Sequence, residues 1–579
     1  MPEGYVVLVL HAHLPYVLSH GRWPYGTDWL CEAACECYIP LVGLIDRLAA
    51  EGRPAHFTVG VTPVLCEMLA SPAFRPVLDA YVREKMRAAA ADRKSFEAQG
   101  EGALADLAQT WERFYASCLA EFTDRLGCDL PGAFRRLQDG GQVEVIAGPA
   151  THPYLPLLAL DTSIDAQISQ GVATYRRYFG RAPDGMWLPE CAYRPARPAS
   201  GGRSYAPARR GLEAFLADHG IGYFFLDGAH AADQPAGGAS AAAGGQALPA
   251  PPAGVYGQGY YNAAARRARG AAGPASDGGC LDIYSVYKTG AAGAEVPFFI
   301  RDTETSGQVW SSAGYPGDPG YMEFHKKRDP GGLRYWRVTD RHSDLGGKMV
   351  YEPEKAAAHV GEHAAHFARL VEGKLRAYRK RTGRTGVLTL LFDAELFGHW
   401  WFEGIGWLGA LVSALDANYV TIERASTALA SVNPRGAVSL PEGSWGEGGR
   451  HFLWYNKETV WMWRRLYRME QEMGRAVKGA GGGATAKRLL RQMARELFLA
   501  QSSDWQFLIS TRSAADYGEA RFLGHYNAWT ELYAMLGRLR ASGALKDAEK
   551  RALRAIEEKD ALFDDVRPEW FEERTPDGL

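Results

Sequence analysis

The stretch Val387–Trp407, VLTLLFDAELFGHWWFEGIGW, decides the fold prediction because an apolar run leads directly into acids and aromatic residues. Its first six residues are apolar except for Thr389 and predict a buried strand. The side chains that could carry chemistry follow at its end: Asp393, Glu395, His399, Trp400, Trp401 and Glu403. Carboxylates supply acid/base or nucleophilic chemistry, and tryptophans offer flat apolar faces on which a sugar ring can stack. The stretch therefore indicates a strand whose carboxyl end lines an active site, as in parallel barrels.

A second segment repeats this pattern. Met186, Trp187 and Leu188 form a short apolar run that leads to Glu190 and Tyr193. Strand-end acids that are far apart in the sequence can face each other across a barrel mouth, and retaining glycosidases need such a pair about 5–5.5 Å apart. For either acid alone, the alternative is an ordinary strand end whose neighbouring aromatic residues fill the core. The repetition weakens that alternative.

The chain between these landmarks alternates predicted strands and helices, which favours parallel strands covered by helices. Strands are predicted at residues 5–10, 56–61, 143–147, 186–188 and 223–226. Helices are predicted over 32–50, 163–179 and 212–219, the first with a break at Pro40. Two further regions are helical by composition and spacing, namely residues 71–137 and the three segments 457–473, 486–501 and 518–541.

Residues 228–279 are rich in Ala, Gly and Pro and predict a flexible loop that cannot form a packed core. Tyr256, Tyr260 and Tyr261 lie within it. A loop that carries tyrosines beside a barrel mouth could close over a substrate as a lid. A plain insertion without function is the alternative, and the sequence leaves both open.

Composition excludes several classes of function. Lys plus Arg (65) nearly equals Asp plus Glu (67), and this balance does not indicate a nucleic-acid or anionic-membrane partner. Sixteen Trp and 28 Tyr suit a carbohydrate ligand, although a large aromatic core would give the same counts. The eight cysteines show no zinc-type CxxC pairs, and we find no signal peptide or membrane span, so we expect a cytoplasmic protein with reduced thiols.

His11 and His13 end the first predicted strand, and side chains at i and i+2 point to the same side of a strand. Three interpretations remain open. The two rings could contact sugar hydroxyls or tune Glu190, they could bind a metal together with His152 or Asp393, or they could be structural.

Several motifs together resemble those of a known family. HAHLPYV, GQVEVIAGPATHPYLPLL, WLPECAY and FDAELFGHWWFEG occur in this order and resemble the motifs of glycoside hydrolase family 57. QVWSSAGYPGDPGYMEFH, GSWGEGGRHFLWYN and AQSSDWQFL are similar to segments of its α-glucan branching members. The resemblance extends from Tyr5 to about Leu536.

This resemblance implies an α/β fold, an incomplete (β/α)7 barrel with a helical insertion and a C-terminal α-helical domain. We expect the catalytic barrel at residues 1–405, its helical insertion at 71–137 and the flexible loop at 228–279. The helical domain at 406–579 would contribute to the active-site cleft.

By the same resemblance, Glu190 is the expected nucleophile and Asp393 the expected general acid/base. The implied substrate-binding residues are His11, His13, Trp29, His152, Arg301, Trp310, His399, Trp400, Trp445, Trp454 and Asp504. The family also has a loop tyrosine over the active site. The Ala/Gly/Pro insertion makes that loop unusually long here, and Tyr260 or Tyr256 is the nearest match.

The implied activity is retaining transglycosylation that cleaves α-1,4 links and forms α-1,6 branches. The expected partner is an α-1,4-glucan such as amylose, amylopectin or glycogen, with no cofactor, metal, nucleic acid or membrane. An α-amylase or 4-α-glucanotransferase of the same family is the alternative, since all share the chemistry up to the covalent intermediate. A metal-dependent hydrolase or deacetylase and a non-catalytic glucan-binding protein belong to other classes.

Overall fold

The computed structural model describes residues 2–198, 208–232, 281–311, 313–340, 342–415, 419–479 and 483–572. The chain forms two compact units. The first unit contains Met1–Gly60, Met68–Val145 and Glu304–Val432, and the second contains Val61–Glu67, Ile146–Thr303 and Asn433–Leu579. Tyr256, Tyr260 and Tyr261 lie outside the described residues. The lid and the domain boundaries expected from the sequence therefore stay predictions.

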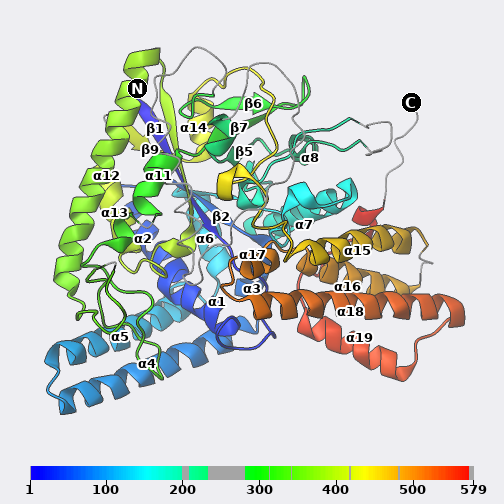
Figure 1. The fold of residues 1–579 in the computed structure, drawn as a ribbon, viewed down its shortest axis with the longest axis horizontal. Coiled ribbons are helices and arrows are strands. Elements are labelled where there is room, and N and C mark those ends of the chain that lie inside the picture. Colours follow the sequence, from blue (N-terminus) through cyan, green and yellow to red (C-terminus); the bar gives the residue numbers. More distant parts are fainter. Residues whose placement is uncertain are drawn as a thin grey trace. The chain divides into compact units, whose positions relative to one another are not determined.

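The first unit is built around a sheet with strand order β3-β2-β1-β8, in which β9 also pairs with β1 (Figure 1). Its strands are β1 (Gly4–Ala12), β2 (Phe57–Val61), β3 (Val143–Ile146), β8 (Gly386–Asp393) and β9 (Val420–Ile422). β1 runs parallel to β8 with His11 opposite Asp393. Nearly every residue of these two strands is buried, as expected for parallel strands covered on both faces.

The helices of this unit are α1 (Thr27–Ala33), α2 (Ile39–Ala50), α4 (Phe74–Ala98), α5 (Gly102–Ala120), α6 (Leu130–Asp139), α11 (Thr303–Val309), α12 (Pro353–Thr382), α13 (Gly404–Ala414) and α14 (Ala425–Ser431). α12 and α14 contact the strands directly. α3 (Pro63–Ala70) spans a boundary between the two units. α4 and α5 pack against each other as a helical hairpin (Figure 1), within the region 71–137 that the sequence predicts to be helical.

The helical segment does not break at Pro40, which is the second residue of α2. Its irregularity is a π-helical turn at Ala34–Tyr38, which directly precedes α2. Pro40 removes one N–H donor from this continuous helical segment, and the irregular turn lies immediately before it.

The second unit contains a smaller sheet with strand order β4-β5-β7-β6. Its strands are β4 (Gly185–Met186), β5 (Tyr223–Leu226), β6 (Tyr287–Thr289) and β7 (Val296–Ile300), and β6 is antiparallel to β7. β4 is shorter than the strand predicted at 186–188 because Pro189 begins a 3-10 turn, η4 (Pro189–Cys191). The same unit contains the helices α7 (Asp161–Phe179), α8 (Leu212–Asp218) and α9 (Ala229–Ala232).

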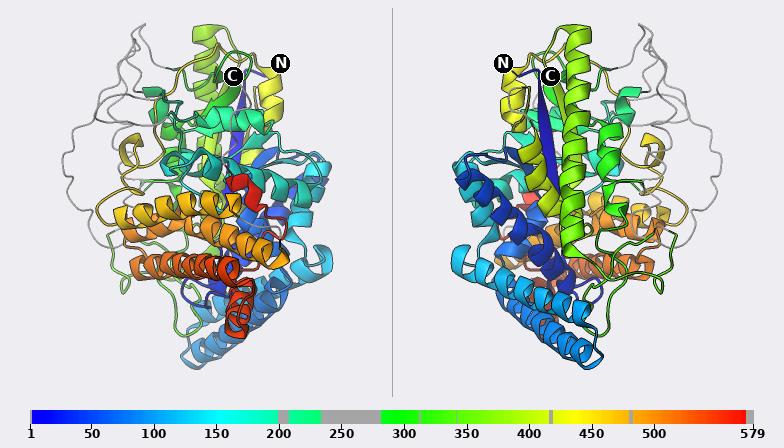
Figure 2. Two further views of the ribbon diagram at one scale, coloured as in Figure 1. Left: turned by 90° about the vertical axis from the view of Figure 1, so that its right-hand side faces the viewer. Right: turned by 90° about the vertical axis from the view of Figure 1, so that its left-hand side faces the viewer.

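From Val460 to Lys559 the chain is mostly helical, as predicted. The helices of this region are α15 (Val460–Lys478), α16 (Ala484–Ala500), α17 (Asp504–Ser510), α18 (Ala515–Ser542) and α19 (Asp547–Lys559), drawn from gold to red in Figures 1 and 2. α16 packs along α18 through apolar side chains at helical spacing, such as Leu489, Met493 and Leu497. The α/β class with C-terminal helices is confirmed, and both sheets are open, as an incomplete barrel requires.

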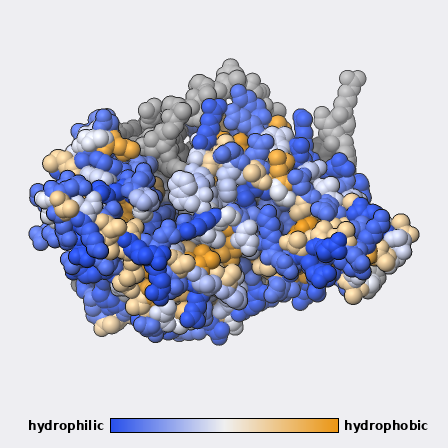
Figure 3. Space-filling view, turned by 90° about the horizontal axis from the view of Figure 1, so that it is seen from below, coloured by the Kyte–Doolittle hydropathy of each residue, from blue (hydrophilic) through white to orange (hydrophobic). Residues whose placement is uncertain are grey.

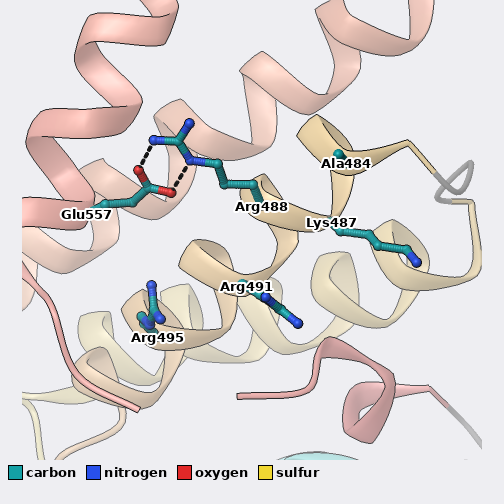
Figure 4. Close-up of a pocket in the computed structure, with 6 residues that line it drawn as sticks. All are labelled: Ala484, Lys487, Arg488, Arg491, Arg495 and Glu557. Atoms are coloured by element: carbon teal, nitrogen blue, oxygen red, sulfur yellow. Dashed lines mark hydrogen bonds and ion pairs between the residues drawn. The ribbon is translucent and has the colours of Figure 1, made fainter. Parts of the chain in front are cut away.

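Hydrophilic residues prevail on the face of the molecule that Figure 3 shows, and apolar ones are scattered among them. α16 presents Lys487, Arg488, Arg491 and Arg495 around a shallow pocket of about 390 Å³ (Figure 4). Arg488 pairs there with Glu557 of α19, with 2.6 Å between Nε and Oε1. Half of the Arg488 side chain is exposed, so this ion pair adds little to stability.

Candidate active site

Asp393 is the last residue of β8 and the first residue of the polar segment that the sequence predicts at the end of this strand. The parallel register places it beside His11 of β1. The rings of His11 and His13 are stacked with centroids 6.0 Å apart, so both point to the same side, as the i, i+2 spacing predicts. A carboxylate and two imidazoles therefore meet at neighbouring strand ends of the first unit.

Glu395 lies two residues beyond Asp393 in the 3-10 turn η6 (Ala394–Leu396) and is fully buried. Its Oε1 accepts hydrogen bonds from the Tyr38 hydroxyl at 2.5 Å and from the His13 backbone N–H at 3.0 Å. Burial raises the pKa of Glu395 to about 8, the Tyr38 hydrogen bond opposes this rise, and the charge of Asp393 adds to it. Glu395 is thus a predominantly neutral acid at pH 7 that ties the end of β1 to the segment after Asp393.

We expect Glu395 to make the protein less stable as the pH rises. Its pKa is about 8 in the folded protein and near 4.5 when unfolded, so between these values the folded state binds more protons. Stability from the neutral acid is complete below pH 4.5 and is lost as the pH passes through 8. The melting temperature of Glu395→Gln should therefore fall less between pH 5 and pH 8.5 than the melting temperature of the wild type. If circular dichroism showed the same dependence of the melting temperature on pH in both proteins, this expectation would be contradicted.

Glu190 occupies a strained backbone position in the second unit. Its φ is 62°, and Cys191 and His152 also have positive φ values of 47° and 57°. Residues other than glycine rarely adopt this conformation, which concentrates at functional sites. The backbone N–H of Trp445 donates to the Glu190 carbonyl at 3.0 Å and supports the unusual turn.

Two donors orient the Glu190 carboxyl group. Trp445 Nε1 donates to Oε2 at 2.6 Å, and Ser503 Oγ donates to Oε1 at 3.3 Å. Ser503 Oγ also lies 3.0 Å from His152 Nδ1, and the Ser503 N–H donates to the His152 carbonyl at 3.1 Å. Three of the predicted residues, Glu190, His152 and Trp445, are thereby brought into one hydrogen-bonded cluster. Such fixed orientation is what an attacking carboxylate requires.

Arg301 contacts this cluster through Trp445. Its Nη1 donates to Asp227 Oδ2 at 3.2 Å, and its guanidinium lies over the Trp445 ring at 5.6 Å. Asp504, predicted as a polar contact to substrate, accepts a hydrogen bond from the Ser502 hydroxyl.

Trp454 is placed differently from the other predicted tryptophans. It is fully buried and stacks on Tyr154 with ring centroids 4.3 Å apart. Its ring thus supports the loop in this structure, and its contact with a glucan stays a prediction. From the same loop, Phe452 and Tyr455 are exposed.

The predicted tryptophans of the first unit are half-buried. Trp310 and Trp400 meet edge to face with centroids 5.4 Å apart, and Trp29 meets Tyr25 in the same way at 6.1 Å. Each keeps part of its ring accessible, as a stacking platform needs.

The sequence prediction missed three polar residues of these clusters: Tyr38, Asp227 and Ser503. It named Glu395 as a candidate for chemistry but assigned it no role. Ser503 is next to the predicted Asp504 in the sequence, so proximity was an available signal. Tyr38 and Asp227 carried none, because only the fold brings them to their partners.

The two clusters lie in a chain that belongs to glycosyl hydrolase family 57, whose family model matches residues 7–441. Residues 465–571 match the model of the C-terminal region of 1,4-alpha-glucan branching enzymes. The chain is 38% identical to a 1,4-alpha-glucan branching enzyme of Thermococcus kodakarensis, over 97% of this chain and 77% of that protein. It is 30% identical to a probable 1,4-alpha-glucan branching enzyme of Mycobacterium tuberculosis, over 97% and 96% of the two chains.

Three solved structures are also similar to this chain in fold and sequence. The crystal structure of the Thermococcus kodakaraensis branching enzyme with glucose matches with a TM-score of 0.85 and 36% identity, covering 99% of this chain and 97% of that one. The branching enzyme of Pyrococcus horikoshii matches with 0.85 and 35%, covering 100% and 98%. The alpha-amylase AmyC of Thermotoga maritima matches with 0.79 and 27%, covering 99% and 100%. Among the described residues, no helix is both long and apolar enough to cross a membrane.

Proposed function

We propose that this protein is a 1,4-α-glucan branching enzyme, a retaining glycosyltransferase. The match of residues 465–571 to the C-terminal region of branching enzymes carries the proposal. The catalytic region alone is less informative, because AmyC, an alpha-amylase, shares the fold at lower identity. We further propose that the substrates are amylose, amylopectin or glycogen, and that the enzyme serves glycogen synthesis in the cytoplasm without a nucleic-acid or membrane partner.

The proposed mechanism is a double displacement. Glu190 attacks the anomeric carbon while Asp393 donates a proton to the glycosidic oxygen, which leaves with the reducing-end part of the chain. Asp393 then removes the proton from the 6-hydroxyl of an acceptor glucan, whose oxygen displaces Glu190 and forms an α-1,6 link with retention. The hydrogen bonds from Trp445 and Ser503 support the assignment of Glu190, because they hold its carboxyl group in one orientation.

Proton NMR of amylose during incubation tests this function. A branching enzyme should produce α-1,6 anomeric signals with few new reducing ends. Reducing ends or redistributed α-1,4 chains without an α-1,6 signal would make it an α-amylase or a 4-α-glucanotransferase. Activity that survives exhaustive chelation would exclude a metal site at His11 and His13 as the centre of the chemistry.

Branching also requires that an acceptor sugar compete successfully with water for the covalent intermediate. We propose that Trp310, whose half-buried ring meets Trp400 edge-on, contacts the acceptor chain. Trp310→Ala should therefore lower α-1,6 transfer by about fivefold and raise the share of hydrolysis, since a stacked aromatic contact contributes on the order of 1 kcal/mol.

Trp461→Ala is the matched control for this experiment. Trp461 is also half-buried and has an edge-on aromatic partner, Phe522, but it is not a predicted site residue. Transfer and hydrolysis should keep their ratio in this variant. An equal fall of both activities in Trp310→Ala would remove Trp310 from the acceptor site.

A further inference from the structure

The helical segment between Thr27 and Ala50 contains a π-helical turn, η1 (Ala34–Tyr38), between α1 and α2. All five residues of this turn are buried. π-turns are rare, and they occur frequently at functional sites. The contacts of this one indicate what it does.

Successive side chains of the turn reach the segment that follows Asp393. Glu36 Oε2 lies 2.8 Å from His399 Nδ1, and the Cys37 thiol donates to the Ala394 carbonyl at 3.1 Å. Tyr38 donates to Glu395, as described above. The polar segment after β8 therefore lies directly against the π-turn.

Gly398 permits this close approach. Its φ is +97°, and a Cβ atom there would lie 1.9 Å from the Glu36 carbonyl oxygen. Any other residue would push the segment away from the turn. The contact between Glu36 and His399 thus depends on the close approach of the Gly398 backbone to the Glu36 carbonyl.

Arg334 completes the contact. Its Nη2 lies 3.0 Å from Glu36 Oε2, and its Nη1 donates to the His399 carbonyl at 2.9 Å. The side chains of Glu36, His399 and Arg334 are all less than 10% exposed. Burial opposes the charge on Glu36, but Arg334 and the hydrogen bond from His399 lower the pKa of Glu36 to about 2. Glu36 is therefore a carboxylate throughout the working pH range.

The chemistry of these groups fixes the tautomer of His399. A carboxylate only accepts hydrogen bonds, so the hydrogen must be on His399 Nδ1. In the neutral ring Nε2 is then the acceptor, and in the charged ring it is a donor. The ring is held on one side by Glu36 and its backbone by Arg334, so its orientation has little freedom.

We infer that Glu36 is a positioning residue for the reaction, which sets the tautomer and orientation of His399, with Arg334 holding Glu36 in place. The inference rests on the proposed function and on the family resemblance, which implies that His399 is a substrate-binding residue. Stability alone does not account for the arrangement, because a buried ion pair adds little net stability over apolar residues of similar size.

A double-mutant cycle tests the inference. Glu36→Gln should lower kcat for turnover of amylose chains by about 10- to 100-fold, the effect typical of partners that orient a functional histidine, with KM within about twofold. In a His399→Gln background the same change should lower kcat less than about twofold, since its target is gone. Equal factors in both backgrounds would overturn the inference.

The control is Glu32→Gln. Glu32 is a carboxylate on the same helical segment, one turn before Glu36, and within the described residues its one ion pair is a 3.8 Å contact with Lys327. Its kcat should match that of the wild type. Total chain turnover is measured rather than α-1,6 links, so the cycle is readable whether the wild type branches or hydrolyses. A wild type that forms no α-1,6 links would refute the branching function and leave the cycle intact.

A second measurement covers the case in which Glu36→Gln does not fold because Arg334 loses its partner. Glu36→Gln combined with Arg334→Met leaves no buried unpaired cation. The ¹⁵N shifts of the His399 ring, assigned by comparison with His399→Gln, should change from those of a pure Nδ1–H tautomer to those of a mixture. A ring that keeps the wild-type shifts would overturn the inference.

Discussion

Replacing Glu190 with Gln is expected to abolish turnover of amylose, with a loss on the order of 10⁴-fold or more. An amide cannot attack the anomeric carbon, so the covalent intermediate does not form. Gln has nearly the same shape and keeps a carbonyl oxygen that can accept from Trp445 or Ser503. The loss would therefore report chemistry and not a collapsed site.

The measurement is the rate of chain turnover by the purified variant, with its melting temperature compared to that of the wild type. Glu447→Gln serves as the control, because Glu447 is an exposed carboxylate two residues after Trp445. It should keep activity within about twofold. If Glu190→Gln retained more than a tenth of wild-type turnover, Glu190 could not be the nucleophile.

The sequence predicted β8 well and the turn at Glu190 less well, and the physical reasons differ. β8 is buried on both faces, so its apolar run alone predicts it. The turn at Glu190 depends on Trp445, which is 255 residues away in the sequence. No local pattern contains that hydrogen bond, so the strand was extended to Leu188 instead of ending at Met186.

The π-turn and the aromatic residues show a similar limit. Pro40 is a local signal for a break, yet the actual irregularity precedes it and is held by contacts with residues from Ala394 to His399. Trp454 and Trp310 look alike in the sequence, since both stand in polar loops near a predicted site. In the structure Trp454 is buried and stacks on Tyr154, a contact that no local sequence pattern contains.

Asp393→Asn is expected to lower turnover of amylose by about 10²- to 10⁴-fold, the usual contribution of a general acid/base. The loss has two origins, because Asp393 would protonate the departing oxygen in the first step and activate the acceptor in the second. These origins can be separated with a maltooligosaccharyl fluoride donor. Fluoride leaves without a proton, so the first step should recover in Asp393→Asn and should stay absent in Glu190→Gln.

The second step remains slow in Asp393→Asn, since no base activates the acceptor. A glycosyl-enzyme should therefore accumulate when this variant is mixed with the fluoride, and intact-protein mass spectrometry should find the added sugar, with digestion placing it on Glu190.

Glu395→Gln is the matched comparison. Glu395 is two residues away and buried, and the proposed mechanism assigns it no proton transfer, so this variant should not accumulate the adduct. An adduct on Glu190 in Asp393→Asn alone would assign both carboxyl groups in one experiment, because only a nucleophile can carry the sugar and only a missing base can strand it there. An adduct on another residue, or the absence of any adduct, would contradict the assignment of Glu190 as the nucleophile.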